Sequence, residues 1–373
     1  MHPAAYDYVA RYATDDPIDL VEIGARNVNY TVRPLFPNAR YHGIDAQPGE
    51  CVDEVADGAT WQPPEPVDLV ICAEVFEHTP DWRRIVANVP AMLRPGGRAV
   101  FTMAGPGRPP HGVNIDDPLS PGHYANISVG ELAEAMAAAG FVDVDVDQLV
   151  DDTRGTARTR PAAVLTTLLC ATEDPQRGKR WPPVGTVLDQ LLASLGGVPA
   201  VVLHDRELDP PPTLPAHLER VAPGGNPYHY RWSLYDEWLA DAGPVGWVWC
   251  VDGTDVEMLH APWSSMVPGV LYCGSEPITS VSAGWLADGH PSHGATREDR
   301  PLLNAGILGG DVVTVRAFVS TLVAELAACG DDLTDMAAFN RVAAGFEVVT
   351  GERVHTSFRG YEHDHPTAWW RHK

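Results

Sequence analysis

The stretch from Gly246 to Val256 constrains the fold of this chain more than any other. Apolar and aromatic residues follow one another without interruption from Trp247 to Val251. Asp252 comes directly after them, and a second carboxylate, Asp255, comes three positions later. A continuous apolar run of this length, preceded by a Gly-Pro turn, predicts a fully buried strand. Acids at the end of such a strand lie where open α/β sheets bind ligands, and carboxylate oxygens suit Mg²⁺ or Mn²⁺. The alternative is an Asx-type turn that closes a core strand and leaves both acids in solvent.

Length and charge limit the classes of protein to consider. A chain of 373 residues exceeds what one ordinary hydrophobic core organises, so we expect two domains. The formal net charge of −24 argues against a general nucleic-acid-binding surface, because nonspecific affinity for phosphates comes from lysine and arginine. Nucleic acid is therefore not an expected partner.

Cysteine usage and the N-terminus favour a cytoplasmic protein. The six cysteines lie far apart, several of them inside apolar runs, which is typical of reduced core thiols. The first residues lack the basic start and apolar centre of a signal peptide, and no apolar run reaches the length of a membrane span. We therefore expect no membrane span and a cytoplasmic localisation.

The first half of the chain alternates short apolar strands with helical segments. Residues 18–24 form a predicted strand that ends in Glu22 and Gly24, and residues 41–45 form a second strand that ends in Asp45, with a helix expected over residues 29–36. An acid at the end of the second strand, about twenty residues after the glycine, is where dinucleotide-type folds bind ribose hydroxyls. Further strands are expected at residues 67–73, 98–103 and 141–146, and helices at 82–93 and 129–139, the last with a capping box at Ser128.

These segments resemble class I S-adenosylmethionine-dependent methyltransferases over roughly residues 1–172. The matching motifs are Val21-Glu22-Ile23-Gly24, Gly43-Ile44-Asp45, Asp68-Leu69-Val70 through Glu77-His78, Leu93-Arg94-Pro95-Gly96-Gly97, and His123-Tyr124 through Glu131-Leu132 to Gly140-Phe141. The resemblance implies a Rossmann-like sheet that binds S-adenosyl-L-methionine. It implies that Glu22 and Gly24 border the methionine part, that Asp45 accepts the ribose hydroxyls, and that Asp57 or its neighbour lies near the adenine.

The loop after the first strand departs from the family pattern. This loop is usually glycine-rich in the family, whereas Gly24 is followed here by Ala25, Arg26, Asn27 and Val28. Glycine is needed where a side chain would collide or where φ must be positive, so a non-catalytic binding module is the alternative to an active methyltransferase. Four residues are candidates to face the cleft, without an assigned general base among them: His78, His111, Asp116 and His123.

The join between the two halves is placed near residue 180. The apolar run over residues 162–171 is expected to complete the first sheet as its last strand. Residues 173–183 combine charge, proline and glycine without periodicity, which is typical of a linker. The predicted domains are therefore residues 1–180 and residues 181–373.

The second half of the chain is predicted to form another α/β unit, with glycines and polar residues after its later strands. Asn304, Gly306 and Gly309 combine an amide with positions where a backbone can approach a ligand closely. Thr334 is a possible helix cap that places Asp335 in the first turn of the next helix. The chain ends in a segment with two tryptophans followed by His372.

Together with Asp252 and Asp255, these residues resemble nucleotide-sugar glycosyltransferases with a GT-A type fold over roughly residues 186–373. The resemblance implies that Asp252 and Asp255 hold Mn²⁺ or Mg²⁺, with His372 as the third protein ligand. It also implies that three residues line the donor, namely Asn304, Gly306 and Gly309, and that Asp335 is a catalytic residue facing donor sugar or acceptor. The acids are spaced Asp-x-x-Asp where the family has Asp-x-Asp, so one of them could reach the metal through water.

The sequence thus predicts an α/β protein of two domains, a Rossmann-like methyltransferase sheet followed by a GT-A-like domain. The expected function is that of a bifunctional transferase, in which methyl transfer and metal-dependent glycosyl transfer act on one glycan or glycosylated acceptor. The expected partners are a nucleotide-sugar donor and that acceptor. The alternatives are a glycosyltransferase with a non-catalytic methyltransferase-like module, or a second domain that only binds a sugar or nucleotide.

Overall fold

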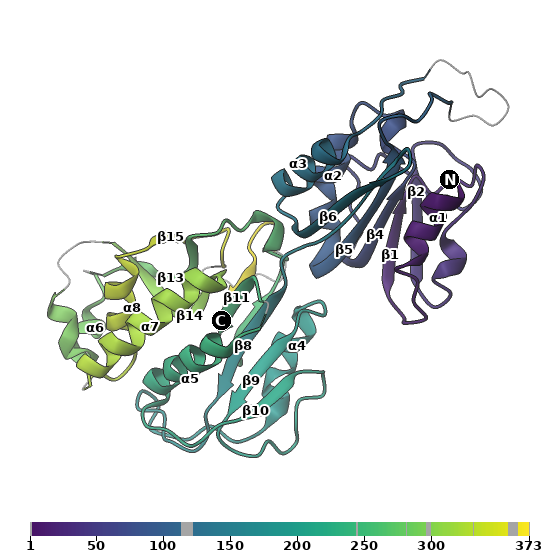
Figure 1. Cartoon of the computed structure of the whole chain (residues 1–373). Coiled ribbons are helices and arrows are strands. Elements are labelled where there is room, and N and C mark those ends of the chain that lie inside the picture. Colours follow the sequence, from purple (N-terminus) through teal and green to yellow (C-terminus); the bar gives the residue numbers. More distant parts are fainter. Residues whose placement is uncertain are drawn as a thin grey trace. The chain divides into compact units, whose positions relative to one another are not determined.

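The computed structural model describes residues 2–112, 122–243, 245–280, 282–295, 300–330, 332–356 and 365–372. The chain forms two compact units, Met1–Pro161 (unit 1) and Ala162–Lys373 (unit 2), each built on its own seven-stranded sheet (Figure 1). Helices and strands alternate in both units, as the predicted α/β class requires. In the part of the chain that the structure describes, no helix is long and apolar enough to cross a lipid bilayer.

The sheet of unit 1 is mostly parallel and Rossmann-like, with strand order β3-β2-β1-β4-β5-β7-β6. Strands β1 to β5 pair in parallel, whereas β7 runs antiparallel to both β5 and β6. The strands are β1 (Asp19–Ile23), β2 (Arg40–Asp45), β3 (Glu54–Val55), β4 (Val67–Ala73), β5 (Leu93–Ala104), β6 (Val142–Leu149) and β7 (Asp152–Arg158).

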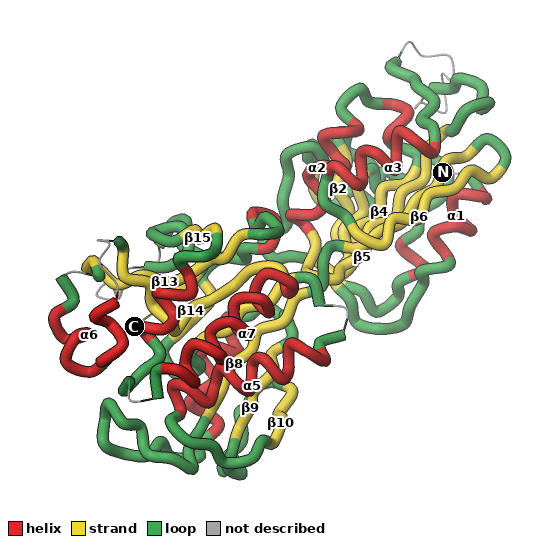
Figure 2. The backbone as a smooth tube through the Cα atoms, turned by 60° about the vertical axis from the view of Figure 1, so that its left-hand side comes forward, coloured by secondary structure: helices red, strands yellow, loops and turns green. Residues whose placement is uncertain are grey.

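Helices cover both faces of this sheet, which explains why its central strands read as continuous apolar runs. Figures 1 and 2 show α1 (Pro3–Ala10) on one face, and α2 (Trp82–Met92) with α3 (Val129–Ala138) on the other. Successive side chains of a strand point to opposite faces. Leu20 of β1 accordingly packs in the core with Val9 of α1, and its neighbour Val21 packs in the core with Val86 of α2.

Two local predictions for unit 1 have different outcomes. The capping box is confirmed, because the Ser128 hydroxyl accepts the Glu131 N–H and the Glu131 carboxylate accepts the Ser128 N–H. The helix expected over residues 29–36 is wrong, because only a 3-10 turn at Arg33–Leu35 forms there. Pro34 and the β-branched residues before it explain the loss, since proline removes a backbone donor and branching restricts χ1.

The other 3-10 turns are Phe76–His78, Gly185–Leu188, Trp263–Ser265 and Pro291–Ala295.

The sheet of unit 2 has strand order β10-β9-β8-β11-β14-β13-β15. Strands β8 to β11 pair in parallel, β14 runs antiparallel to both β11 and β13, and β13 is parallel to β15. The strands are β8 (Ala162–Leu168), β9 (Ala200–His204), β10 (His217–Arg220), β11 (Trp247–Val251), β13 (Val270–Thr279), β14 (Pro301–Asp311) and β15 (Glu347–Val349). The helices are α4 (Asp189–Ser194), α5 (Pro227–Asp241), α6 (Gly284–Gly289), α7 (Val312–Ala328) and α8 (Met336–Ala343).

The predicted division near residue 180 is wrong, because β8 belongs to the second sheet. This strand pairs in parallel with β9 through Val164↔Ala200 and with β11 through Ala162↔Trp247. A strand buried on both faces can join either sheet as far as its own sequence is concerned. The antiparallel pair β6–β7 completes the first sheet instead. Residues 173–183 are therefore part of unit 2, where Asp174 is buried and accepts the backbone N–H groups of Gln176 and Arg177.

The C-terminal segment is an integral part of unit 2. Strand β16 (Trp370–His372) pairs antiparallel with β12 (Val256–Met258), and the Val256↔His372 pair joins the two ends. Trp370 is fully buried and packs against Trp249 with ring centroids 5.2 Å apart. The anchored tail thus places His372 beside the loop that follows β11.

Candidate functional site

The first candidate site lies where the strand order of unit 1 reverses. From β1 the chain proceeds outward through β2 and β3, and from β4 it proceeds the other way to β5, so the loops after β1 and β4 diverge. Ligands of open α/β sheets bind in the crevice outside the carboxyl ends of such strands. A cavity of about 430 Å³ opens there, and all four residues predicted to bind the cofactor line it: Glu22, Gly24, Asp45 and Asp57.

Gly24 has the backbone that the prediction requires. Its φ is +80°, and a Cβ at this position would overlap the Val75 side chain at the end of β4. Only glycine satisfies both conditions without strain. The absence of further glycines in the loop does not close the cavity, because the stem of Arg26 packs against Gly49 and the cavity remains open beside it.

The two predicted aspartates organise loops at the rim of this cavity. Asp45 accepts the backbone N–H of Arg26 at 3.2 Å and that of Gln47 at 2.8 Å, so one carboxylate ties the loop after β1 to the loop after β2. Asp57 accepts the N–H of Ala59 at 2.8 Å in a local turn. Both side chains are thereby held at fixed positions along the cavity wall.

Glu22 is a buried acid at the base of the cavity. It is 2% exposed, and Tyr41 donates its hydroxyl hydrogen to the Oε2 atom. Burial raises the pKa of Glu22 to about 8, with a smaller opposing effect from Arg33. The side chain is therefore protonated at neutral pH, which the sequence did not indicate.

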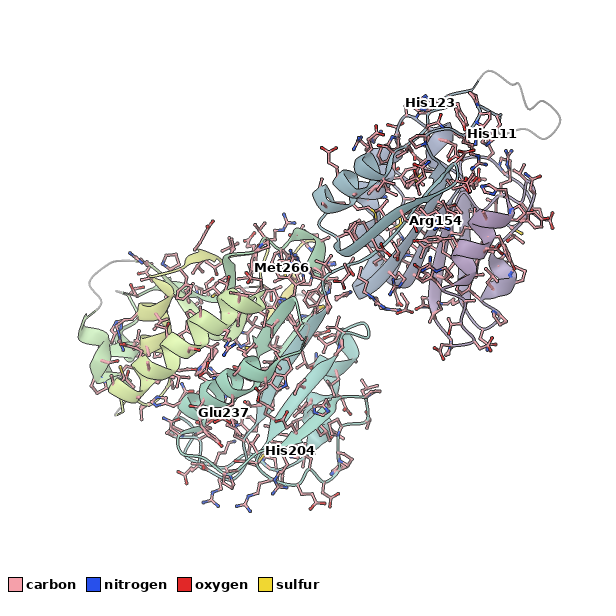
Figure 3. All side chains as sticks on the ribbon, in the orientation of Figure 1. His111, His123, Arg154, His204, Glu237 and Met266 are labelled. Atoms are coloured by element: carbon pink, nitrogen blue, oxygen red, sulfur yellow. The ribbon has the colours of Figure 1, made fainter. Side chains whose placement is uncertain are left out.

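A group of rings borders the same cavity near its mouth. His78 and His111 both line the cavity and lie 5.0 Å apart between ring centroids, and Tyr124 lies within 5.8 Å of each. His123, at the same end of unit 1, is solvent-exposed and does not line the cavity (Figure 3). Asp116 lies outside the described residues. Sequence reasoning named both histidines but missed Tyr124.

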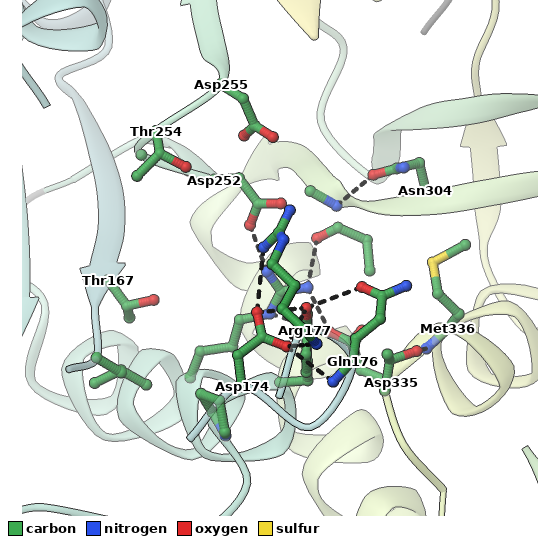
Figure 4. A pocket seen from close by; sticks show the side chains of 18 of the residues that line it. Thr167, Asp174, Gln176, Arg177, Asp252, Thr254, Asp255, Asn304, Asp335 and Met336 are labelled. Atoms are coloured by element: carbon green, nitrogen blue, oxygen red, sulfur yellow. Dashed lines mark hydrogen bonds and ion pairs between the residues drawn. The ribbon is translucent and has the colours of Figure 1, made fainter. Parts of the chain in front are cut away.

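The second candidate site lies at the corresponding reversal in unit 2, between β8 and β11. A cavity of about 250 Å³ opens at the carboxyl ends of these strands (Figure 4). Asp252 and Asp255 follow β11 on one side of it, while Asp174, Gln176 and Arg177 lie across from them. The other predicted residues that line it are Asn304, Gly306, Asp335 and His372.

Three predicted metal ligands come together in this cavity. One ligand atom from each of Asp252, Asp255 and His372 lies within 4.8 Å of the others. Burial, and then the charge of Asp252, raise the pKa of Asp255 to about 6, and its Oδ1 atom is buried without a hydrogen-bond partner in the described structure. Two carboxylates and one imidazole form a donor set suited to Mn²⁺ or Mg²⁺.

Asn304 and Gly306 form the wall next to these three residues. The Asn304 side chain accepts the Gly306 N–H at 2.6 Å and donates to Glu276 Oε1 at 2.6 Å. A Cβ on Gly306 would lie 2.6 Å from Asp252 Oδ2 and 2.7 Å from His372 Cε1, so the site requires glycine there. Gly309 does not line the cavity, because it pairs with Trp249 across the strands and leaves room for that indole.

Asp335 lines this cavity and is held there by two side chains of α5. It is 1% exposed, accepts from Arg231 Nε at 3.0 Å and Nη2 at 2.5 Å, and also accepts from Trp232 Nε1. Arg231 also forms an ion pair with Asp252. Burial lowers the pKa of Arg231, but the carboxylates of Asp335 and Asp252 outweigh burial and raise it. Asp335 thus positions Arg231, and its catalytic role stays a prediction.

Sequence reasoning missed Arg231 and the polar residues across the cavity. Arg231 lies on a helix whose aromatic face dominated the sequence pattern. Arg177 packs over the Trp181 ring at 5.0 Å, and Tyr228 donates to Asp174. Asp174, Arg177 and Trp181 fall in a segment with linker composition, and nothing in that composition indicates a cavity wall.

Comparisons with known proteins find similarity to methyltransferases over part of the chain. Residues 1–146 match the methyltransferase domain family. A probable S-adenosylmethionine-dependent methyltransferase of Mycolicibacterium smegmatis is 33% identical over 103 residues, which cover 28% of this chain and 37% of that protein. The trans-aconitate 2-methyltransferase of an Azoarcus species is 29% identical over 161 residues, which cover 38% of this chain and 60% of that protein.

Solved structures of methyltransferases are similar to part of this chain. An S-adenosylmethionine-dependent methyltransferase of Mesorhizobium loti is 17% identical with a TM-score of 0.33, over 41% of this chain and 97% of that chain. The 1,6-didemethyltoxoflavin methyltransferase of Burkholderia thailandensis is 21% identical with a TM-score of 0.32, over 42% of this chain and 77% of that chain. Residues 1–146 of this chain are thus similar to a methyltransferase domain, and the chain spans 37% and 60% of the length of the two sequence relatives.

Proposed function

We propose that unit 1 transfers a methyl group from S-adenosyl-L-methionine to an acceptor. The observation that carries this proposal is the arrangement of Gly24, Asp45 and Asp57 around one cavity at the strand-order reversal. Gly24 permits close approach of the cofactor to the backbone, Asp45 accepts its ribose hydroxyls, and Asp57 lies at the adenine end. The cavity volume of about 430 Å³ falls in the range of small-molecule sites.

Calorimetry with S-adenosyl-L-methionine and the full chain tests this proposal. We expect binding in the wild type and at least about tenfold weaker binding in Asp45→Ala, because the ribose loses its charged acceptor. Asp145→Ala is the matched control, since Asp145 is an exposed acid on β6 away from the cavity. If the wild-type chain bound no cofactor, unit 1 would be a non-catalytic module.

For unit 2 we propose metal-dependent glycosyl transfer from a nucleotide sugar. The supporting observation is the convergence of Asp252, Asp255 and His372 from distant parts of the chain beside Asn304 and Gly306. These three side chains would hold Mn²⁺ or Mg²⁺, which supplies electrostatic stabilisation to the leaving diphosphate. Asn304 and Gly306 line the space for the donor.

The proposed proton acceptor for the incoming hydroxyl is Glu276, which remains when the other carboxylates that line this cavity are considered in turn. Among the described lining residues, Asp174, Asp252 and Asp335 are paired with arginine. Asp255 belongs to the proposed metal ligands, which leaves Glu276, a half-buried acid that accepts from the Asn304 amide. In the proposed step the hydroxyl proton moves to Glu276, the acceptor oxygen bonds to the anomeric carbon, and the bond from that carbon to the diphosphate breaks.

A panel of nucleotide sugars with Mn²⁺, analysed by mass spectrometry, tests glycosyl transfer. We expect one donor to be consumed by the wild type, and consumption to cease with chelator or in Asp252→Asn and Asp255→Asn. Glu207→Gln, an exposed acid outside the cavity, is the matched control. Binding of a nucleotide sugar without turnover would leave unit 2 as a sugar or nucleotide binder.

We further propose that both units act on one glycan or glycosylated acceptor. Joining two sites in one chain raises the effective concentration of a shared substrate at the second site. A purified-protein assay with a single acceptor should then yield a product that carries both the sugar and the methyl group. If each reaction required a different acceptor, the shared-substrate proposal would fail.

A further inference from the structure

We propose that the methyltransferase unit contains a divalent metal site of its own, formed by Glu77, His78 and His111 at the cofactor cavity. One ligand atom from each residue lies within 4.8 Å of the others. Glu77 and His78 come from the 3-10 turn that follows β4, and His111 comes from the loop after β5. The role assigned to this metal rests on the proposed methyl transfer, whereas the site itself rests on the geometry.

The burial of the Glu77 carboxylate is the strongest indication that a cation binds here. Its side chain is 0% exposed, and neither carboxylate oxygen meets the full geometry of a hydrogen bond with a described residue, the backbone N–H groups of Glu77 and Ala104 being the donors near it. A buried polar group without a partner is costly, and a buried unpaired charge is more so. A divalent cation would supply the missing partner for both oxygens.

Each of the two histidines places a ring nitrogen beside this acid. His111 Nδ1 lies 3.4 Å from the carbonyl oxygen of Pro109, so in the tautomer that donates this hydrogen bond its Nε2 is left free to bind a metal. Such a backbone contact is the usual way in which a ligating histidine is oriented. Tyr124 donates to the same carbonyl at 3.1 Å and packs against both imidazoles.

His78 completes the set as a neutral imidazole. Its ring nitrogens form no hydrogen bond with any residue described in the structure. A metal binds an imidazole in its neutral form, through a ring nitrogen. One carboxylate and two imidazoles favour a first-row transition-metal ion, such as Zn²⁺, Mn²⁺ or Fe²⁺, over Ca²⁺.

The metal site lies where the methyl acceptor would bind. His78 and His111 line the same cavity as Gly24 and Asp45, so an open coordination position would face the space beside the cofactor. A bound metal lowers the pKa of a coordinated hydroxyl. The acceptor class that fits is an alcohol or hydroxy acid that binds through oxygen. In methyl transfer its O–H proton leaves to solvent, its oxygen bonds to the methyl carbon, and the S–CH₃ bond breaks to give the neutral thioether.

Co²⁺ is the probe for this site, because imidazole and carboxylate ligands give it visible absorption bands. The full chain would carry Asp252→Asn and Asp255→Asn, which remove the proposed ligands in unit 2. We expect one equivalent of Co²⁺ to bind in this background, and affinity to fall at least about tenfold in His111→Gln and in His78→Gln. His123→Gln, a nearby exposed histidine outside the cavity, should bind as the background does.

Cofactor binding by the same variants separates this proposal from the proposed function. His111→Gln should still bind S-adenosyl-L-methionine, which also reports that unit 1 is folded. If Co²⁺ did not bind in the background chain, or bound equally well to His111→Gln and His78→Gln, the metal site would be refuted. In that case methyl transfer could still proceed with either histidine as a proton acceptor. Co²⁺ binding without cofactor binding would instead refute the methyl-transfer role and leave the site in place.

Discussion

Arg231 donates two hydrogen bonds to a single oxygen of Asp335, from Nε at 3.0 Å and from Nη2 at 2.5 Å, in a fully buried part of unit 2. We predict that Asp335→Asn lowers stability, because it leaves the Arg231 guanidinium buried without this carboxylate. Removal of one partner from a buried ion pair costs about 3–5 kcal/mol. Denaturant unfolding measures the change. A variant with wild-type stability and no glycosyl transfer would support the predicted catalytic role of Asp335.

Gly306 should be intolerant of a single methyl group. In Gly306→Ala the Cβ would lie 2.6 Å from Asp252 Oδ2 and 2.7 Å from His372 Cε1, so the two proposed ligands must move. We expect Mn²⁺ affinity to fall at least about tenfold, as it does when the support of metal ligands is disturbed. Calorimetry checks this, with Gly330→Ala as control because its Cβ would meet no atom within 4 Å. Unchanged affinity would contradict the proposed ligand set.

Gly24→Ala should weaken cofactor binding for two reasons, the strained backbone at a positive φ and a collision with a neighbouring side chain. The residue has φ +80°, and its Cβ would overlap the Val75 side chain. The double variant Gly24→Ala with Val75→Ala should recover part of the affinity, because the collision is removed and only the strained φ remains. Gly130→Ala on α3 is the control and should gain about 0.5–1 kcal/mol of stability, since alanine favours a helix. Calorimetry and thermal unfolding give the two readouts.

The raised pKa of Glu22 predicts how the stability of unit 1 depends on pH. Its pKa rises from 4.5 to about 8 on folding, so the folded state binds more protons than the unfolded state between these values. The free energy of unfolding should therefore fall as pH rises through this window, by at most about 1.4 kcal/mol per pH unit. Glu22→Gln cannot ionise and should flatten the slope. Denaturant midpoints measured from pH 5 to pH 8 in both proteins test the prediction, and equal slopes would contradict it.

Glu276→Gln separates proton transfer from metal binding. Because the amide cannot accept the proton of the incoming hydroxyl, kcat for glycosyl transfer should fall by roughly 10²–10⁴-fold. Mn²⁺ affinity should stay at the wild-type value, since Glu276 is not among the proposed ligands. Steady-state kinetics and calorimetry measure the two quantities. A parallel loss of metal affinity would show that Glu276 acts on the metal site instead.

Much of the architecture could be predicted from local patterns. The apolar runs that end in Glu22 and Asp252 became buried strands, because a strand covered on both faces needs apolar residues throughout. Gly24 and Asp45 could be placed at one cavity because the carboxyl ends of adjacent parallel strands lie at the same edge of a sheet. The segment over residues 29–36 does not form a helix, because Pro34 and the β-branched residues before it outweigh its apolar spacing.

The sequence by itself determined the α/β class, the capping box at Ser128 and the strand ends that carry the acids, because these depend on spacing within a short segment. Only the tertiary structure decided that β8 joins the second sheet, that the β12–β16 pair brings His372 to Asp252, and that Arg231 engages Asp335. Strand pairing and buried ion pairing join residues that are far apart in the chain. Their partners depend on the register and closure of the whole unit, which no local pattern encodes.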